Sequence, residues 1–191
     1  MTTPPVILLL SGSLRAGSSN ESVLRTAQAL APGVPGSPRT VLYDGLGGLP
    51  HFNPDDDRAP LPEPVARLRE AIAGASALLI CCPEYAGTLP GAFKNLLDWT
   101  VGGTEIGDKP VAWVNAAAPG RGEGASAALR TVLGYTGAAV VDGACARIPV
   151  DARTVDADGT IADPAARERL SAALGSLIEA AAAATAADEP A

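Results

Sequence analysis

The stretch with the clearest capacity for chemistry is residues 11–20, which read SGSLRAGSSN. An apolar run at residues 6–10 precedes it and predicts a buried strand, and apolar residues at helical spacing follow it. A turn rich in Gly and Ser at the start of a helix can direct backbone N–H groups and the partial positive charge of the helix at an anion. Arg15 can add a bidentate contact to phosphate. Taken alone, the stretch fits a phosphate-binding loop and an ordinary helix-capping turn about equally.

The glycine spacing narrows the class of phosphate loop. Gly12 and Gly17 have the G-x-x-x-x-G spacing of the nucleoside-triphosphate loop, but Ser18 and Ser19 stand where that loop needs Lys followed by Ser or Thr. The dinucleotide fingerprint G-x-G-x-x-G is absent. What remains is a loop for a terminal monophosphate, as in the flavodoxin-like folds that hold FMN.

The other reactive residue types form no recognisable catalytic set. His51 is the only histidine, and its Gly-, Pro- and Asp-rich surroundings predict a plain surface position. The three aspartates at 55–57 predict a solvated turn, and we expect no metal site. Cys81 and Cys82 are adjacent, so they predict two small buried residues that face opposite sides of a sheet at the end of a strand. No Ser stands in a nucleophile-elbow pattern.

Composition predicts one globular domain over residues 1–191, with a sizeable core and no internal repeat. The net charge of −7 argues against nucleic acid as a partner, because phosphate backbones need a basic face. No apolar run approaches the about 20 residues of a membrane helix, and the first residues lack a secretory pattern. Three cysteines do not form a disulfide framework. We therefore expect a cytoplasmic protein without a membrane partner.

Alternating strand and helix patterns must position these residues. Apolar runs predict strands at residues 6–10, 39–44, 77–82, 110–115 and 138–150, the last with a candidate break at 142–143. Helical spacing predicts helices at residues 21–31, 63–73, 91–100, 125–135 and 164–184. This alternation predicts an α/β fold, a doubly wound parallel sheet of five strands with helices on both faces. Ligands of such sheets bind beyond the carboxyl ends of the strands, where we expect the loops 11–20, 83–90 and 116–124.

The second of these loops makes the interpretation specific. Residues 83–99 read PEYAGTLPGAFKNLLDW, and together with GSLRAGSSN they resemble the NADPH-dependent FMN reductase family of quinone, chromate and azo-dye reductases. That family shows the patterns G-S-L-R-x-x-S-x-N and P-E-Y-N-x-x-x-P-G-x-x-K-N-x-x-D-W. The resemblance also takes in LPHFN at 49–53 and Pro119-Gly120, so it covers residues 6 to about 150.

The resemblance implies a flavodoxin-like sheet of order 2-1-3-4-5 and an oxidoreductase with FMN as cofactor and NADPH or NADH as co-substrate. Hydride would pass through FMN to a quinone-like acceptor in a two-electron, ping-pong reaction. The alternatives are a flavodoxin-type carrier of single electrons and a flavin-free binding protein with the same fold. A homodimer or homotetramer is also implied. Phe93, Leu97 and Trp99 are large apolar groups on a short helix, and we expect them, with the loop around Phe52, at the subunit contact.

The resemblance also assigns site residues by position. No side chain is expected to be catalytic, because flavin N5 would carry the chemistry. The phosphate would be held by Ser13, Arg15, Ser18, Ser19 and Asn20. The isoalloxazine ring would lie along Pro83, Glu84, Tyr85, Ala86 and Gly87, largely on backbone groups, and the site would be closed by Ala117, Ala118, Pro119 and Gly120. Ala86 departs from the family, which usually has Asn there, and the third loop, AAAPGRGEG, matches loosely.

Overall fold

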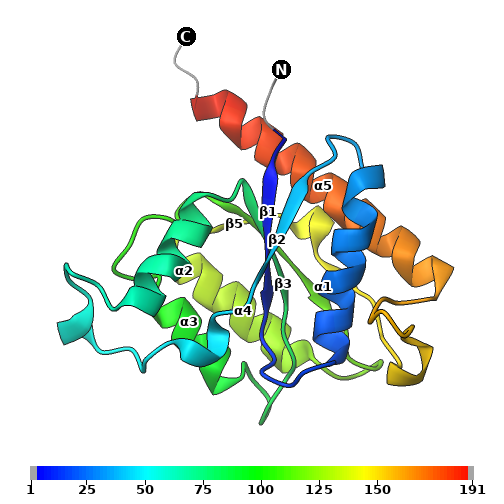
Figure 1. The fold of residues 1–191 in the computed structure, drawn as a ribbon, viewed down its shortest axis with the longest axis horizontal. Coiled ribbons are helices and arrows are strands. Elements are labelled where there is room, and N and C mark those ends of the chain that lie inside the picture. Colours follow the sequence, from blue (N-terminus) through cyan, green and yellow to red (C-terminus); the bar gives the residue numbers. More distant parts are fainter. Residues whose placement is uncertain (1–3, 189–191) are drawn as a thin grey trace.

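A computed structural model describes residues 4–188, in which one parallel β-sheet is covered by helices on both faces (Figure 1). The strand order is β2-β1-β3-β4-β5, and β6 pairs with the end of β4. The strands are β1 Val6–Ser11, β2 Arg39–Tyr43, β3 Ala77–Cys81, β4 Pro110–Asn115, β5 Ala139–Val140 and β6 Ala146–Arg147. The expected doubly wound, flavodoxin-like order is confirmed. The single domain expected over residues 1–191 stays a prediction, and residues 1–3 and 189–191 lie outside the described part.

The expectation of five strands is wrong by one, because the last strand is divided. Ala139 and Val140 pair with the start of β4, whereas Ala146 and Arg147 pair with its end. Between them the 3-10 turn Asp142–Ala144 replaces ladder hydrogen bonds with local ones. Asp and Gly favour turns over strands, so the break expected at residues 142–143 is confirmed.

Two helices cover one face of the sheet and three cover the other, with α1 and α5 on one side and α2, α3 and α4 on the opposite side (Figure 1). The helices are α1 Ser19–Leu30, α2 Glu63–Ala73, α3 Gly91–Asp98, α4 Glu123–Tyr135 and α5 Pro164–Asp188. Further 3-10 turns stand at Ala31–Gly33, Leu46–Gly48, Pro54–Asp56 and Ala152–Thr154.

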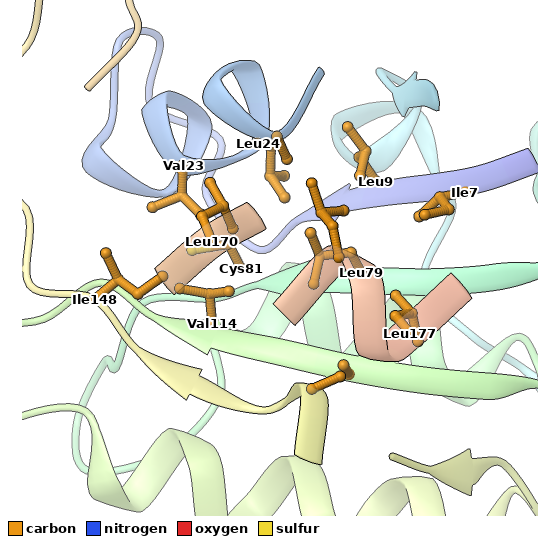
Figure 2. Packing of buried hydrophobic residues seen from close by; sticks show 14 of the residues in the cluster. Ile7, Leu9, Val23, Leu24, Leu79, Cys81, Val114, Ile148, Leu170 and Leu177 are labelled. Carbon is orange, nitrogen blue, oxygen red and sulfur yellow. The ribbon is translucent and has the colours of Figure 1, made fainter. Parts of the chain in front are cut away.

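The sheet is apolar on both faces, which explains the continuous apolar runs of its strands. In β1, Ile7 and Leu9 pack towards α1 and α5, and Leu8 and Leu10 pack towards the other helices. Figure 2 shows the first core, in which the strands meet buried side chains of the two helices, among them Val23, Leu24, Leu170 and Leu177. These cores fix the strands whose ends carry the loops.

The large apolar side chains on and just after α3 are not exposed for a subunit contact, contrary to the expectation from the sequence. Phe93, Leu97 and Trp99 are each 0% exposed and lie in the chain's own core. Trp99 follows the end of α3, where its indole N–H donates to Pro50 O at 2.8 Å and its ring meets Phe52 edge-on. The side chains therefore fill this chain's core, because the loop from residue 50 onward folds over the helix.

The prediction of a solvated turn for the aspartates at 55–57 is wrong for one of the three. Asp55 and Asp56 are exposed, but Asp57 pairs with Arg69 of α2 at 2.6 Å, and both side chains are less than a tenth exposed. Arg69 also donates two hydrogen bonds to Trp99 O. A buried charge needs such a partner, so Asp57 fastens the loop to α2. His51 is exposed, as predicted.

Candidate functional site

The loops that follow β1, β3 and β4 meet around one cavity of about 340 Å³ at the carboxyl edge of the sheet. The cavity is lined by Ser19, Asn20, Cys82, Pro83, Glu84, Ala116, Ala117, Ala118, Arg121, Gly122 and Val150. Six of the predicted site residues therefore lie on its wall: Ser19, Asn20, Pro83, Glu84, Ala117 and Ala118. The others stand on the same loops outside the lining: Ser13, Arg15, Ser18, Tyr85, Ala86, Gly87, Pro119 and Gly120.

The first loop leaves the sheet through a close backbone approach. Gly12 N donates to Cys81 O at 2.9 Å, and a Cβ on Gly12 would lie 2.4 Å from Cys82 Sγ. Only glycine fits there, so the backbone stays against the end of β3. Gly17 has φ +64°, a left-handed conformation that glycine adopts without strain. The two glycines thus shape the loop, independently of any phosphate.

Helix α1 begins with a capping arrangement that uses part of the same loop. Ser18 Oγ accepts from Glu21 N at 3.2 Å, and Glu21 Oε2 accepts from Gly17 N at 2.9 Å. The hydrogen bond from Arg25 lowers the pKa of Glu21, which keeps this carboxylate charged. Ser18 is buried and caps the helix, yet its hydroxyl hydrogen remains able to donate. Both interpretations of the stretch, helix cap and anion loop, are therefore compatible.

The remaining phosphate candidates differ in exposure. Ser13 Oγ accepts from Arg15 N at 3.2 Å, and the Arg15 side chain is exposed with no ion pair among residues 4–188. Asn20 is buried, and its Oδ1 accepts from Cys81 Sγ at 3.4 Å. The loop therefore offers one available guanidinium among uncharged donors, a set that suits a monophosphate.

The second loop folds into a tight hairpin after Glu84. Tyr85 and Thr88 exchange two backbone hydrogen bonds of 3.0 and 3.1 Å, and Ala86 and Gly87 between them have φ +50° and +77°. Two consecutive positive φ values define a type I′ turn, in which Asn followed by Gly is preferred. Ala86 therefore occupies a left-handed position that Asn tolerates better. The hairpin leaves Tyr85 53% exposed beside the site.

The third loop is held by side chains that the sequence analysis missed. Asn115, buried at the end of β4, accepts from Ala117 N at 3.0 Å and donates to Arg121 O at 3.2 Å. Arg147 of β6 donates to Ala118 O and Arg121 O and pairs with Glu123. Asn115 could have been singled out from the sequence, because it is a polar residue at the end of an apolar strand. Arg147 is recognisable only once β6 is known to lie beside β4.

The two adjacent cysteines occupy opposite faces of the sheet, as expected. Cys81 lies in the core towards α1 and α5, and Cys82 lies in the other core and on the cavity wall. Burial raises the pKa of both thiols, that of Cys82 to about 12. At neutral pH both thiols are therefore protonated and poor nucleophiles.

A doubly wound parallel sheet with a glycine-shaped loop after β1 and a cavity at its carboxyl edge defines a flavodoxin-like nucleotide-binding protein. The model of the NADPH-dependent FMN reductase family matches residues 5–151. The chain belongs to that family, so it is an oxidoreductase with FMN as its cofactor and NAD(P)H as its co-substrate.

Known proteins agree with this assignment. An NAD(P)H-dependent FMN reductase of Pseudomonas aeruginosa is 33% identical over 174 residues, which cover 90% of this chain and 92% of that protein. A 2-hydroxy-1,4-benzoquinone reductase of a Burkholderia species is 32% identical over 168 residues, 86% of this chain and 89% of that protein. The solved structure of FerB, a flavoenzyme NAD(P)H:(acceptor) oxidoreductase of Paracoccus denitrificans, is similar with a TM-score of 0.81 and 29% identity, over 94% of this chain and 98% of that one. Within residues 4–188, no helix is long and apolar enough to cross a membrane.

Proposed function

We propose that the protein takes hydride from NADPH or NADH and reduces a quinone or a similar small acceptor by two electrons. When bound, FMN supplies the redox chemistry, and the protein supplies binding, orientation and electrostatics. The observation that carries the proposal is that all three loops contribute to the wall of one cavity. Its walls offer backbone groups and few charges, which suits a planar, neutral ring system.

The first loop is proposed to hold the FMN phosphate. Arg15 supplies the charge, and Ser13, Ser18, Ser19 and Asn20 supply uncharged hydrogen-bonding groups beside the N-terminus of α1. The exposed guanidinium of Arg15 supports this role, because no carboxylate among residues 4–188 pairs with it.

The second and third loops are proposed to hold the isoalloxazine ring, mostly through the backbone. Their residues are Pro83, Glu84, Tyr85, Ala86 and Gly87 on one side and Ala117, Ala118, Pro119 and Gly120 on the other. One open site over the bound ring must then serve the nicotinamide and the acceptor in turn. The oxidised nicotinamide leaves before the acceptor enters, so we expect ping-pong kinetics.

The test is anaerobic mixing of the FMN-loaded protein with NADPH or NADH. We expect the yellow colour of oxidised flavin to disappear, and addition of a benzoquinone to restore it. The alternative, a flavodoxin-type carrier, predicts that neither nicotinamide reduces the flavin whereas dithionite does. That result would contradict the proposed reductase activity.

The assembly and location expected from the family remain proposals. We propose a homodimer or homotetramer, although the buried side chains of α3 no longer indicate where the subunits meet. Light scattering at micromolar concentration tests this, and a monomer would contradict it. A cytoplasmic location also stays a prediction, tested by cell fractionation.

A further inference from the structure

One side chain of the second loop reaches the helix that follows the third loop. Glu84 Oε2 accepts from Gly124 N at 2.7 Å and from Ala125 N at 3.2 Å, both in the first turn of α4. Glu84 is half-buried and lines the cavity. The contact joins residues 40 positions apart in the chain.

Helix α4 needs this partner because it has no cap of its own. Its N-cap residue is Gly122, which has no side chain to accept a hydrogen bond. The first N–H groups of a helix lack partners within the helix, and a carboxylate there is favoured by the helix dipole. Glu84 supplies the missing acceptor from another loop, so the cap also fixes the spacing between the two loops.

The close approach depends on a second glycine. A Cβ on Gly124 would lie 2.1 Å from Gly87 O and 2.9 Å from Glu84 Oε2. Gly124 stands within a helix, where Ala is ordinarily preferred. The absent side chain therefore lets the backbone of the second loop's hairpin lie directly against α4.

The opposite side of the third loop is fastened separately. Asn115 and Arg147 hold the third loop against β4 and β6, whereas Glu84 holds the first turn of α4 against the second loop. Loss of Glu84 would thus leave the third loop attached to the sheet but would remove this contact with the second loop.

We propose that Glu84 is a positioning residue, whose carboxylate joins the second and third loops into one rigid wall of the FMN site, and that Gly124 is the position that permits this contact. The inference rests on the proposed function of these loops in holding FMN. It assigns the Glu84 side chain to α4 rather than to the flavin.

The test compares Glu84→Ala with Glu84→Gln, which keeps an acceptor oxygen but loses the charge. Two quantities are measured: hydrogen exchange of the Gly124 and Ala125 amides in the protein without FMN, and the dissociation constant of FMN by flavin fluorescence. We expect Glu84→Ala to speed both exchanges about tenfold and to weaken FMN about five- to tenfold, the scale of a lost helix cap. Glu84→Gln should retain most of the amide protection and most of the FMN affinity of the unaltered protein. Glu168 is an exposed glutamate on α5, and Glu168→Ala should change neither the exchange nor the affinity.

Gly124→Ala provides a second test, with Gly134→Ala as its control. Both glycines lie in α4, but a Cβ on Gly134 would meet nothing within 4 Å. Helix propensity predicts that both changes stabilise α4. We expect Gly134→Ala to leave FMN affinity unchanged and Gly124→Ala to weaken it about tenfold or more, since Gly87 must move.

Unchanged amide exchange in Glu84→Ala would overturn the inference. So would faster exchange with an FMN affinity within about twofold of the original, because Glu84 would then be only a local helix cap. If the unaltered protein does not bind FMN, the proposed function fails, and the exchange measurement still tests whether Glu84 joins the loops. If Glu84→Ala does not fold, Glu84→Gln and the two alanine variants of α4 decide the question.

Discussion

Arg15 is the only charged side chain among the residues that we propose to hold the FMN phosphate. Its guanidinium is exposed on a loop that otherwise offers only uncharged donors. We expect Arg15→Ala to weaken FMN binding by about 1.5–3 kcal/mol, the range of a charge-assisted hydrogen bond. Riboflavin lacks the phosphate, so its affinity should hardly change. Titration of both ligands by fluorescence measures this, and an equal loss for both would show that Arg15 does not contact phosphate.

Ala86 carries a backbone cost that its side chain does not offset. Its φ of +50° lies in the left-handed region, where Asn is more favourable than Ala. We expect Ala86→Asn to raise the free energy of unfolding by about 0.5–1 kcal/mol, and Ala86→Val, which is β-branched, to lower it by at least as much. Urea unfolding measures both, and a stabilising valine would refute this explanation of the position.

At the scale of elements, α3 holds the segment that carries His51. Asn95 accepts from Phe52 N at 2.8 Å and donates to Pro50 O at 2.9 Å. Each lost hydrogen bond costs about 0.5–1.5 kcal/mol, so we expect Asn95→Ala to destabilise the protein by about 1–3 kcal/mol. Lys94→Ala on the same helix removes only a surface pair with Asp98 and should cost less than about 0.5 kcal/mol. Equal effects of the two changes in thermal unfolding would show that the Asn95 contacts contribute little.

At the scale of the whole molecule, buried thiols make stability depend on alkaline pH. Burial raises the pKa of the thiols of Cys81, Cys82 and Cys145, and that of Cys82 rises to about 12. In the unfolded chain these thiols ionise near pH 8.5, whereas in the folded protein each ionises only at a higher pH. Unfolding then releases protons, so the free energy of unfolding falls as pH rises above about 8.5, by up to about 1.4 kcal/mol per pH unit for each thiol.

Urea unfolding at several pH values between about 8 and 11, with reductant present, measures this slope. Cys82→Ala should reduce this slope by the contribution of about one proton, which is about 1.4 kcal/mol per pH unit. Burial lowers the pKa of Lys109, so this group makes the free energy of unfolding rise with pH. It is one group against three thiols, so we expect the net stability to fall. Stability that stays level to pH 11 would contradict the assignment of the thiols as protonated in the folded protein.

The fold was predictable because each of its signals is local. Apolar runs specify buried parallel strands, helical spacing specifies the covering helices, and alternation of the two leaves few topologies. The position of the glycine-shaped loop after β1 was predictable for the same reason, since Gly12, Arg15 and Gly17 stand together in one short stretch between a strand and a helix.

Contacts between distant segments were decided only by the tertiary structure. Asp57 pairs with Arg69, Arg147 holds the third loop, and Glu84 caps a helix 40 positions further on. The apolar residues of α3 are buried because a loop from another part of the chain folds over them. Periodicity reports which side of an element is apolar, but it does not identify the surface that covers that side. The sequence alone determined the strands, the helices and the place of the loop between β1 and α1. Packing of the whole chain determined how the three loops are held together, since those contacts exist only when the sheet has brought remote residues to one edge.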